Sequence, residues 1–245
     1  MKNYKVTMSF NGTKYHGFQR QDSGIPTVQQ TVEKAFYKLL GEEVTINGCS
    51  RTDAGVHANE FVFSVAIDNA IDERGIIFGL NGVLPKDIAI TACEEMPLDF
   101  HARFNCKGKE YIYLIHNSEI RSPFYEHTVF RSWYPIDAEK LDKASKDFIG
   151  THDFKSFCAT DTDKTETTRT IYDFSVTRQG DIVKFSVKGD GFLYNMVRIM
   201  VGTLLFINDD KLAVDSIPEI IAAKDRSKAG KTVPPQGLYL NKVFY

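Results

Sequence analysis

The stretch Ser-Arg-Thr-Asp-Ala-Gly-Val-His-Ala at residues 50–58 decides how the rest of the chain is interpreted. It lies between two apolar alternations, the stronger of them at 61–66, and this pattern predicts a strand–loop–strand unit. Loops mounted on a sheet often hold reactive side chains. This loop offers a carboxylate at Asp53, a guanidinium at Arg51 and an imidazole at His57. On the residues alone, the commoner role of an Asp-x-Gly aspartate is to form the turn itself.

Length and composition indicate an ordinary globular protein. The chain has 245 residues, of which 42% are hydrophobic and 25% charged, enough for one large domain or two of usual size. Its formal net charge of −2 does not indicate nucleic-acid binding, for which a basic domain is typical. An RNA-binding function therefore requires the 30 Lys and Arg residues to be unevenly distributed over the surface.

Targeting segments and metal sites are not expected. No apolar run approaches the length of a bilayer span, and the first residues enter a strand pattern at once, which predicts no membrane anchor and no signal peptide. The four cysteines form no C-x-x-C pair, so neither a structural zinc site nor a disulfide framework is predicted. Reduced thiols of this kind are typical of a cytoplasmic protein.

The first half of the chain has the element order β-α-β-β-α-β. Its helix at 28–40 is predicted from a helical apolar period, a capping box formed by Thr27 and Gln30, and Gly41 at the stop position. The other expected elements are strands at 4–10, 43–49 and 60–67, a helix at 72–84 and a strand ending near 94. This order is ferredoxin-like, as in RNA-binding four-stranded sheets.

The second half is expected to repeat that order with extra helix. The predicted elements are a strand at 107–115, a helix at 137–149, a hairpin of strands at 171–178 and 182–189, an apolar helix at 192–206 and a last strand at 238–244. A polar stretch at 159–168 is predicted to be an insertion. The fold class is thus α+β: two ferredoxin-like (RRM-like) halves, residues 1–104 and 105–245, with mostly antiparallel sheets meeting at a central active-site cleft.

One long cation, Arg198, lies inside the apolar helix. A buried guanidinium without a partner is opposed by several kcal/mol of desolvation. Arg198 therefore either has a partner in the fold or reaches solvent on a partly exposed face of the helix.

Several separate segments, taken together, resemble the tRNA pseudouridine synthase A family, in the order in which that family has them. They are residues 10–21, 50–58, 80–88, 99–104, 151–157, 191–198 and 229–240. The chain departs from the commoner family pattern by Phe10 and Asn11 in place of Tyr-Asp, Ser50 in place of Gly, and Val233 in place of Ala. The resemblance covers nearly the whole chain.

The resemblance implies roles for named residues. It makes Asp53 the catalytic nucleophile and Arg198 its charge partner, and it makes Tyr111 the ring that stacks on the target base with a hydroxyl available for proton transfer. It also implies that Leu238 lines the uridine pocket and that Arg51 fills the space left by a base turned out of the stack.

Further substrate contacts are implied more weakly. They fall on His57 in the Asp53 loop, on Arg103, and on the basic residues Arg226, Lys228 and Lys231 in or beside the segment 229–240.

The implied reaction isomerises uridine to pseudouridine at positions 38, 39 and 40 in the anticodon stem-loop of tRNA. The same resemblance implies a homodimer that needs neither a metal nor a small-molecule cofactor. Two other classes stay open on the residues: a non-catalytic RNA-binding protein and a retaining N-glycosidase. A retaining glycosidase normally uses two carboxyl groups, and no second carboxyl group is paired with Asp53 by any motif.

Overall fold

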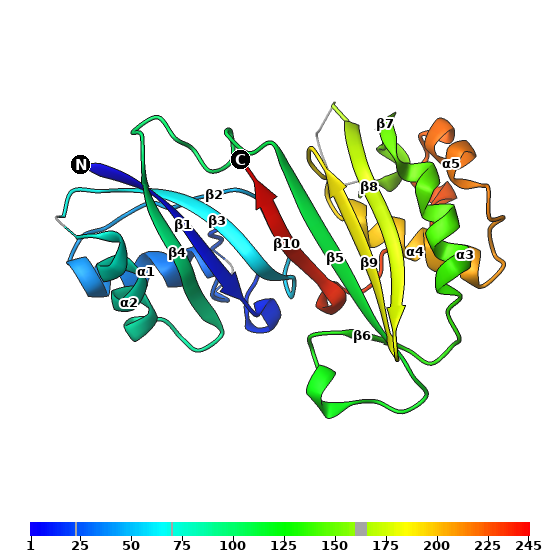
Figure 1. Cartoon of the computed structure of the whole chain (residues 1–245), viewed down its shortest axis with the longest axis horizontal. Coiled ribbons are helices and arrows are strands. Elements are labelled where there is room, and N and C mark those ends of the chain that lie inside the picture. Colours follow the sequence, from blue (N-terminus) through cyan, green and yellow to red (C-terminus); the bar gives the residue numbers. More distant parts are fainter. Residues whose placement is uncertain (23, 70, 160–165) are drawn as a thin grey trace. The chain divides into compact units, whose positions relative to one another are not determined.

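The computed structural model describes residues 1–22, 24–69, 71–159 and 166–245, and the chain forms two compact units (Figure 1). Unit 1 comprises Met1–Lys107 together with Tyr239–Tyr245, and unit 2 comprises Gly108–Leu238. Most of the last strand is thus grouped with unit 1, whereas the sequence analysis assigned it to the second half at 105–245.

The sheet of unit 1 is built around β1 (Lys2–Phe10), which pairs antiparallel with β3 (His57–Ile67) and β4 (Ile88–Met96). The outer edge of β3 is covered by two short partners. β2 (Asn47–Gly48) pairs with it antiparallel, and β10 (Leu238–Phe244) pairs with it in parallel at its first two residues. The strand order is therefore β4-β1-β3 followed by β2 and β10.

Helix α1 (Val28–Leu40) begins and ends as its sequence predicts. The Thr27 side chain accepts from the Gln30 amide, and the Gln30 side chain returns to the Thr27 backbone, so the predicted capping box is confirmed. Gly41 closes the helix in the left-handed conformation at φ 70°. Its apolar stripe is buried, with Val28, Val32 and Phe36 fully inaccessible.

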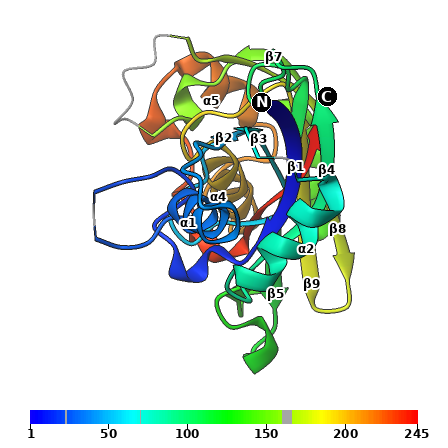
Figure 2. The same cartoon turned by 90° about the vertical axis from the view of Figure 1, so that its left-hand side faces the viewer.

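Helix α2 (Glu73–Val83) lies beside α1 on the sheet of unit 1, as Figures 1 and 2 both show. Asp72 caps it by accepting from the Gly75 amide at 2.7 Å. Gly79 lets the two helices approach, because a Cβ there would come within 2.6 Å of the Leu39 side chain.

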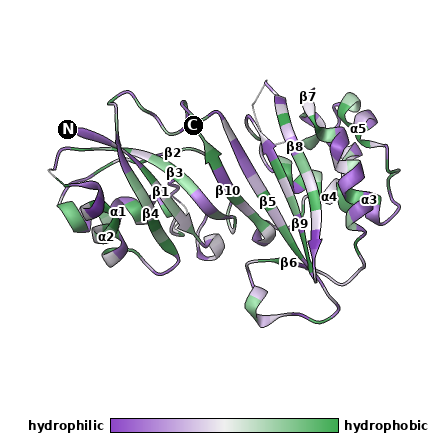
Figure 3. Ribbon diagram, viewed as in Figure 1, coloured by the Kyte–Doolittle hydropathy of each residue, from purple (hydrophilic) through white to green (hydrophobic). Residues whose placement is uncertain are grey.

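Unit 2 has the strand order β5-β9-β8-β7, all antiparallel. These strands are β5 (Gly108–Asn117), β9 (Ile182–Gly189), β8 (Thr168–Gln179) and β7 (Gly150–Asp153), and β6 (Phe130–Ser132) pairs with β5 in parallel. Buried and accessible residues alternate along β9, and Figure 3 shows the corresponding alternation of hydropathy. One face of this sheet therefore forms the core of unit 2.

The helices of unit 2 are α3 (Ala138–Ser145), α4 (Met196–Asn208) and α5 (Ile217–Ala223). α4 is buried along most of its length, as its apolar sequence predicts. Short 3-10 turns complete the chain: η1 (Gly12–Lys14), η2 (Pro123–Tyr125), η3 (Lys146–Phe148), η4 (Lys155–Phe157), η5 (Arg226–Lys228) and η6 (Pro235–Gly237).

Several element boundaries differ from the sequence predictions, and three of the differences change an element substantially. The strand expected at 43–49 is reduced to the two residues of β2. The helix expected at 137–149 is α3 only to Ser145, after which the chain continues as η3. The helix expected from Phe192 begins at Met196, because Asn195 has a left-handed backbone that cannot continue a right-handed helix.

The coarse fold class is as predicted: a mixed α+β chain with mostly antiparallel sheet. Of the insertion predicted at 159–168, residues 160–165 lie outside the described residues. Among the described residues, no helix has the length and hydropathy needed to cross a bilayer.

Candidate active site

The Asp53 loop connects β2 to β3 in unit 1. Its turn is closed by the Val56 amide, which donates to the Asp53 carbonyl at 3.2 Å, and Gly55 has φ 77°, a conformation that favours glycine. Asp53 is half-buried and Arg51 is exposed. The loop therefore presents a partly desolvated carboxylate beside a guanidinium that reaches solvent.

The segment 12–18 packs against this loop, and the two backbones are in direct contact. A Cβ at Gly17, where φ is 79°, would lie 2.5 Å from the Thr52 carbonyl oxygen, and a Cβ at Gly12 would lie 1.9 Å from the Val56 carbonyl oxygen. The Phe18 amide donates to that same Thr52 carbonyl at 3.1 Å. The two motifs at 10–21 and 50–58 are thus one structural unit, and their glycines are required by the close approach.

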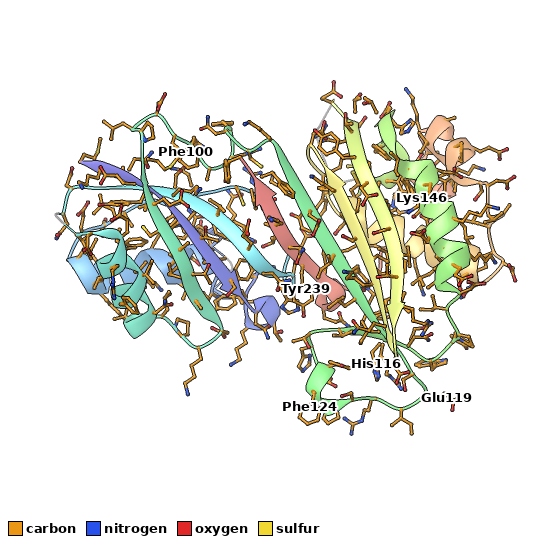
Figure 4. The ribbon with its side chains drawn as sticks, viewed as in Figure 1. Phe100, His116, Glu119, Phe124, Lys146 and Tyr239 are labelled. Atoms are coloured by element: carbon orange, nitrogen blue, oxygen red, sulfur yellow. The ribbon has the colours of Figure 1, made fainter. Side chains whose placement is uncertain are left out.

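His57 begins β3 and is 1% exposed. Its Nδ1 accepts from the Gly12 amide at 3.0 Å, and its ring stacks on Tyr239 of β10, with ring centroids 4.7 Å apart (Figure 4 labels Tyr239). These contacts join the Asp53 loop to the last strand. A direct role of His57 in substrate binding stays a prediction.

In unit 2, Tyr111 and Tyr113 lie on one face of β5. Tyr111 is 6% exposed and packs edge-on against Phe192, with ring centroids 5.2 Å apart. Tyr113 is fully buried, its hydroxyl donates to the Pro234 carbonyl at 2.7 Å, and burial raises its pKa. The packing role predicted for Tyr113 is confirmed.

Arg198 on α4 has partners in the fold of unit 2. Its Nε donates to the Val233 carbonyl and its Nη1 to Oδ1 of Asn195, both at 2.7 Å. The Val233 amide in turn donates to the Arg198 carbonyl at 3.3 Å. Of the two alternatives for this cation, the structure supports a side chain held by polar partners on a half-buried part of the helix.

The closing segment, residues 229–238, precedes most of β10 in the chain and contacts both α4 and β5. A Cβ at Gly202 would lie 1.8 Å from the Lys231 carbonyl oxygen, so the segment lies directly on the helix backbone. Further along, Val233 bonds Arg198 and Pro234 bonds Tyr113. The segment ends at Leu238, which is 6% exposed.

The predicted RNA-contacting cations differ in their surroundings. Arg103 is exposed, and its guanidinium lies 6.0 Å from the centre of the Phe104 ring. Arg226 is half-buried and bonds the closing segment through Oγ1 of Thr232 at 3.2 Å. Lys228 and Lys231 are exposed.

Sequence reasoning named Arg198 but missed the side chain that holds it. Asn195 lies three residues earlier, and an asparagine directly before an apolar helix is an ordinary capping signal. Here the side chain makes no cap and bonds Arg198 instead. No sequence pattern signals this bond, because side chains at i and i+3 are neighbours within a helix, whereas Asn195 lies before the first helical residue.

Known proteins similar to this chain belong to the family that its sequence motifs resemble. The model of a family described as tRNA pseudouridine synthase matches residues 6–105 and 144–245. A protein of Acetivibrio thermocellus named tRNA pseudouridine synthase A is 44% identical over 245 residues, covering all of both chains. A protein of Clostridium acetobutylicum with the same name is 42% identical, again over the full length of both. A family match over most of the chain and full-length relatives above 40% identity define the class of protein.

This chain belongs to the tRNA pseudouridine synthase family. The Asp53 loop and the Arg198 helix both lie within the matched ranges.

Proposed function

We propose that this protein isomerises uridine to pseudouridine in tRNA. The observation that carries the proposal is the family match over residues 6–105 and 144–245, which includes Asp53 and Arg198. Full-length relatives named for the same activity support it. The enzyme is accordingly an isomerase.

The chemistry fits the residues. The N-glycosidic bond breaks, the detached base rotates while it is held, and a carbon–carbon glycosidic bond forms, so substrate and product have the same atoms and the same oxidation level. Asp53 attacks the base or the sugar carbon, as carboxylate nucleophiles do. In this proposal Arg198 keeps Asp53 ionised and aimed, because a nearby opposite charge favours the charged form.

Other side chains handle the nucleotide. Tyr111 stacks on the base, Leu238 lines its pocket, and Arg51 occupies the space that the flipped base leaves in the stem-loop. The exposure of Arg51 on the catalytic loop supports that role, since such a side chain is free to enter the RNA. His57 supports the loop from within unit 1 and contributes to substrate binding through it.

The RNA backbone is contacted by Arg103 and by the cations beside the closing segment. The exposure of Arg103, Lys228 and Lys231 supports this assignment. Losing one phosphate contact should reduce the slope of log affinity against log salt by about 0.7–0.9. An unchanged slope and affinity in Arg103→Ala would remove that residue from the contact set.

Each unit, in this proposal, is a ferredoxin-like half. The order β4-β1-β3-β2 in unit 1, reached through β-α-β-β-α-β, supports it. In unit 2 the support is the sequence β5, α3, β8, β9, α4, with β9 lying between β5 and β8. The boundary between the two ferredoxin-like halves is proposed to lie near residue 104.

The substrate positions are proposed to be 38, 39 and 40 of the anticodon stem-loop, and the cellular location to be the cytoplasm. The substrate positions are tested with a set of transfer RNAs, in each of which one of these three positions carries cytosine in place of uridine. Pseudouridine formed elsewhere in such a tRNA would overturn it.

The enzyme is further proposed to act as a homodimer. Support comes from the segment between β5 and α3, where several large apolar side chains are exposed: Ile120, Phe124, Trp133 and Tyr134. Phe124 is 90% exposed, and Figure 4 shows it on this segment. Light scattering should give about twice the 27.7 kDa of one chain, and a mass of one chain would overturn the dimer.

The product separates this function from its alternatives. Bulk tRNA labelled with tritium at C5 of uridine should release tritium to water without free uracil. Free uracil would indicate a glycosidase, and neither product would indicate an RNA-binding protein without this activity.

Asp53→Asn tests the nucleophile. The amide is nearly isosteric with the carboxylate but cannot act as an anionic nucleophile, so we expect pseudouridine formation to be abolished while folding and tRNA binding persist. Tritium release, circular dichroism and a tRNA binding assay on one preparation measure the three properties. Normal turnover by this variant would exclude the assigned mechanism.

A further inference from the structure

The residue before α4 has an unusual backbone. Asn195 has φ 60° and ψ 7°, in the left-handed region that few residues other than glycine adopt. Asparagine tolerates this region better than most residues because its short side chain forms local hydrogen bonds. At the N-cap position, directly before a helix, such a side chain normally caps the free amides, yet the Asn195 side chain makes no cap.

The Asn195 side chain bonds Arg198 instead. Its Oδ1 accepts from Nη1 of Arg198 at 2.7 Å, while the Val233 carbonyl accepts from Nε at the same distance. The two acceptors bond different nitrogens of one planar group, so together they fix both the direction and the plane of the guanidinium. Hydrogen bonds to a charged group are stronger than those between neutral groups.

The left-handed backbone makes this arrangement compatible with the start of the helix. The Met196 amide closes a turn on the Leu193 carbonyl at 3.1 Å, and the Asn195 carbonyl accepts the first helical bond, from Ile199, at 2.9 Å. The backbone carbonyl of Asn195 thus bonds the helix, while its side chain bonds Arg198. Residues in sparsely populated backbone regions persist where their surroundings fix them, and they concentrate at functional sites.

We infer that Asn195 is a positioning residue for the reaction: it holds the Arg198 guanidinium in the orientation in which that cation serves the catalytic carboxylate. The inference rests on the proposed function, because it takes Arg198 to act in turnover. Asn195 touches Arg198 and is assigned no contact with the substrate.

Asn195→Gly tests it, because glycine adopts the left-handed backbone readily but removes the acceptor. We expect a fall in kcat of about tenfold or more, the factor that corresponds to one hydrogen bond to a charged group. The tRNA dissociation constant and the melting temperature should stay close to those of the wild type. Asn195→Asp is the matched variant: it keeps an acceptor at the same position and should retain most of the activity.

The effect should also be non-additive with loss of the cation. In the background of Arg198→Met, adding Asn195→Gly should lower kcat by less than about twofold, because the group that Asn195 positions is already gone. Full multiplication of the two defects would overturn the inference, as would wild-type kcat in Asn195→Gly.

The outcomes separate this inference from the proposed function. If Arg198→Met turns over much more slowly than the wild type and Asn195→Gly is fully active, the function stands and the positioning role is wrong. If Arg198→Met itself turns over normally, the role of the cation is wrong and the inference falls with it. A fall in tRNA affinity with unchanged kcat in Asn195→Gly would make Asn195 a binding residue and would also reject positioning.

Discussion

Thr52, directly before the proposed nucleophile, has a buried side chain, 7% exposed, whose hydroxyl has no hydrogen-bond partner among the described residues. A buried, unsatisfied hydroxyl costs about 1–3 kcal/mol of stability. The adjacent backbone is well held, since the Thr52 carbonyl accepts from the Phe18 amide. The loss of stability at Thr52 therefore comes from its side-chain hydroxyl and not from its backbone carbonyl.

Thr52→Val should raise the free energy of unfolding by about 1 kcal/mol, because valine has the same shape without the unsatisfied hydroxyl. Urea unfolding measures it, and a two-state transition with an unchanged m-value makes the comparison valid. Thr52→Ser is the control: it keeps the hydroxyl, loses a methyl group and should be less stable than the wild type. A destabilised Thr52→Val would mean that the hydroxyl has a partner in the folded protein.

Residues differ in how far sequence alone predicts their roles. Asp53 and Arg198 could be named because each lies in a motif of its own. Asn195 and Thr52 could not, since what matters is their hydrogen bonding in the fold. Arg198 meets Val233 across 35 positions of sequence, and no local pattern specifies that contact.

Among the elements, α4 and the closing segment depend on glycine for their contact. Gly202 on the helix and Gly230 on the segment lie backbone against backbone: a Cβ at Gly230 would come within 2.4 Å of the Gly202 carbonyl oxygen. The Gly230 amide also donates to Oγ1 of Thr203 at 2.8 Å. This contact places the closing segment so that the Val233 carbonyl can accept from Arg198. The position of the Arg198 guanidinium therefore depends on it.

Gly202→Ala should lower the free energy of unfolding by about 2 kcal/mol or more, since the added methyl group meets the Lys231 carbonyl oxygen, which belongs to the backbone and cannot rotate away. Gly82→Ala in α2 is the matched control. Nothing lies within 4 Å of the added Cβ there, so the gain in helix propensity should stabilise by up to about 1 kcal/mol. Thermal and urea unfolding of both variants measure the contrast; equal effects would contradict the close approach.

Element boundaries were predictable where a local signal fixed them. The start and end of α1 follow from its capping box and Gly41, and the structure has both. β2 is shorter than predicted because an alternation of apolar residues at 43–49 specifies burial but not a pairing partner. α4 starts later than its apolar run because Asn195 has a left-handed backbone, which breaks the helical conformation. The sequence does not reveal that backbone conformation.

At the scale of the whole chain, the last strand returns to the first unit. β10 pairs with the start of β3, the Lys107 amide donates to the Phe244 carbonyl at 2.8 Å, and the Val243 amide donates to Oε1 of Glu60 at 3.0 Å. The sequence predicted the strand but placed it with its neighbours along the chain. Pairing over such a separation is decided by tertiary packing, which periodicity does not encode.

Both units also contain partly buried tyrosine hydroxyls that donate hydrogen bonds. The phenols and their acceptors are Tyr4 with the Ile71 carbonyl, Tyr15 with Asp87, Tyr113 with the Pro234 carbonyl and Tyr245 with the Ala102 carbonyl. Burial raises the pKa of each of these hydroxyls above its ordinary value near 10. The folded chain therefore keeps these protons at a pH where the unfolded chain loses them.

The sign of the resulting pH dependence follows from proton binding. Above about pH 10 the unfolded state binds fewer protons than the folded state, so the free energy of unfolding should fall as pH rises, by up to about 1.4 kcal/mol per pH unit for each such group. Urea unfolding between pH 8 and 11 measures this slope. Tyr245→Phe should make the slope shallower, whereas Tyr37→Phe, which alters an exposed ring, should leave it unchanged. Equal slopes in the wild type and Tyr245→Phe would show that the half-buried phenol of Tyr245 is not a source of the alkaline instability.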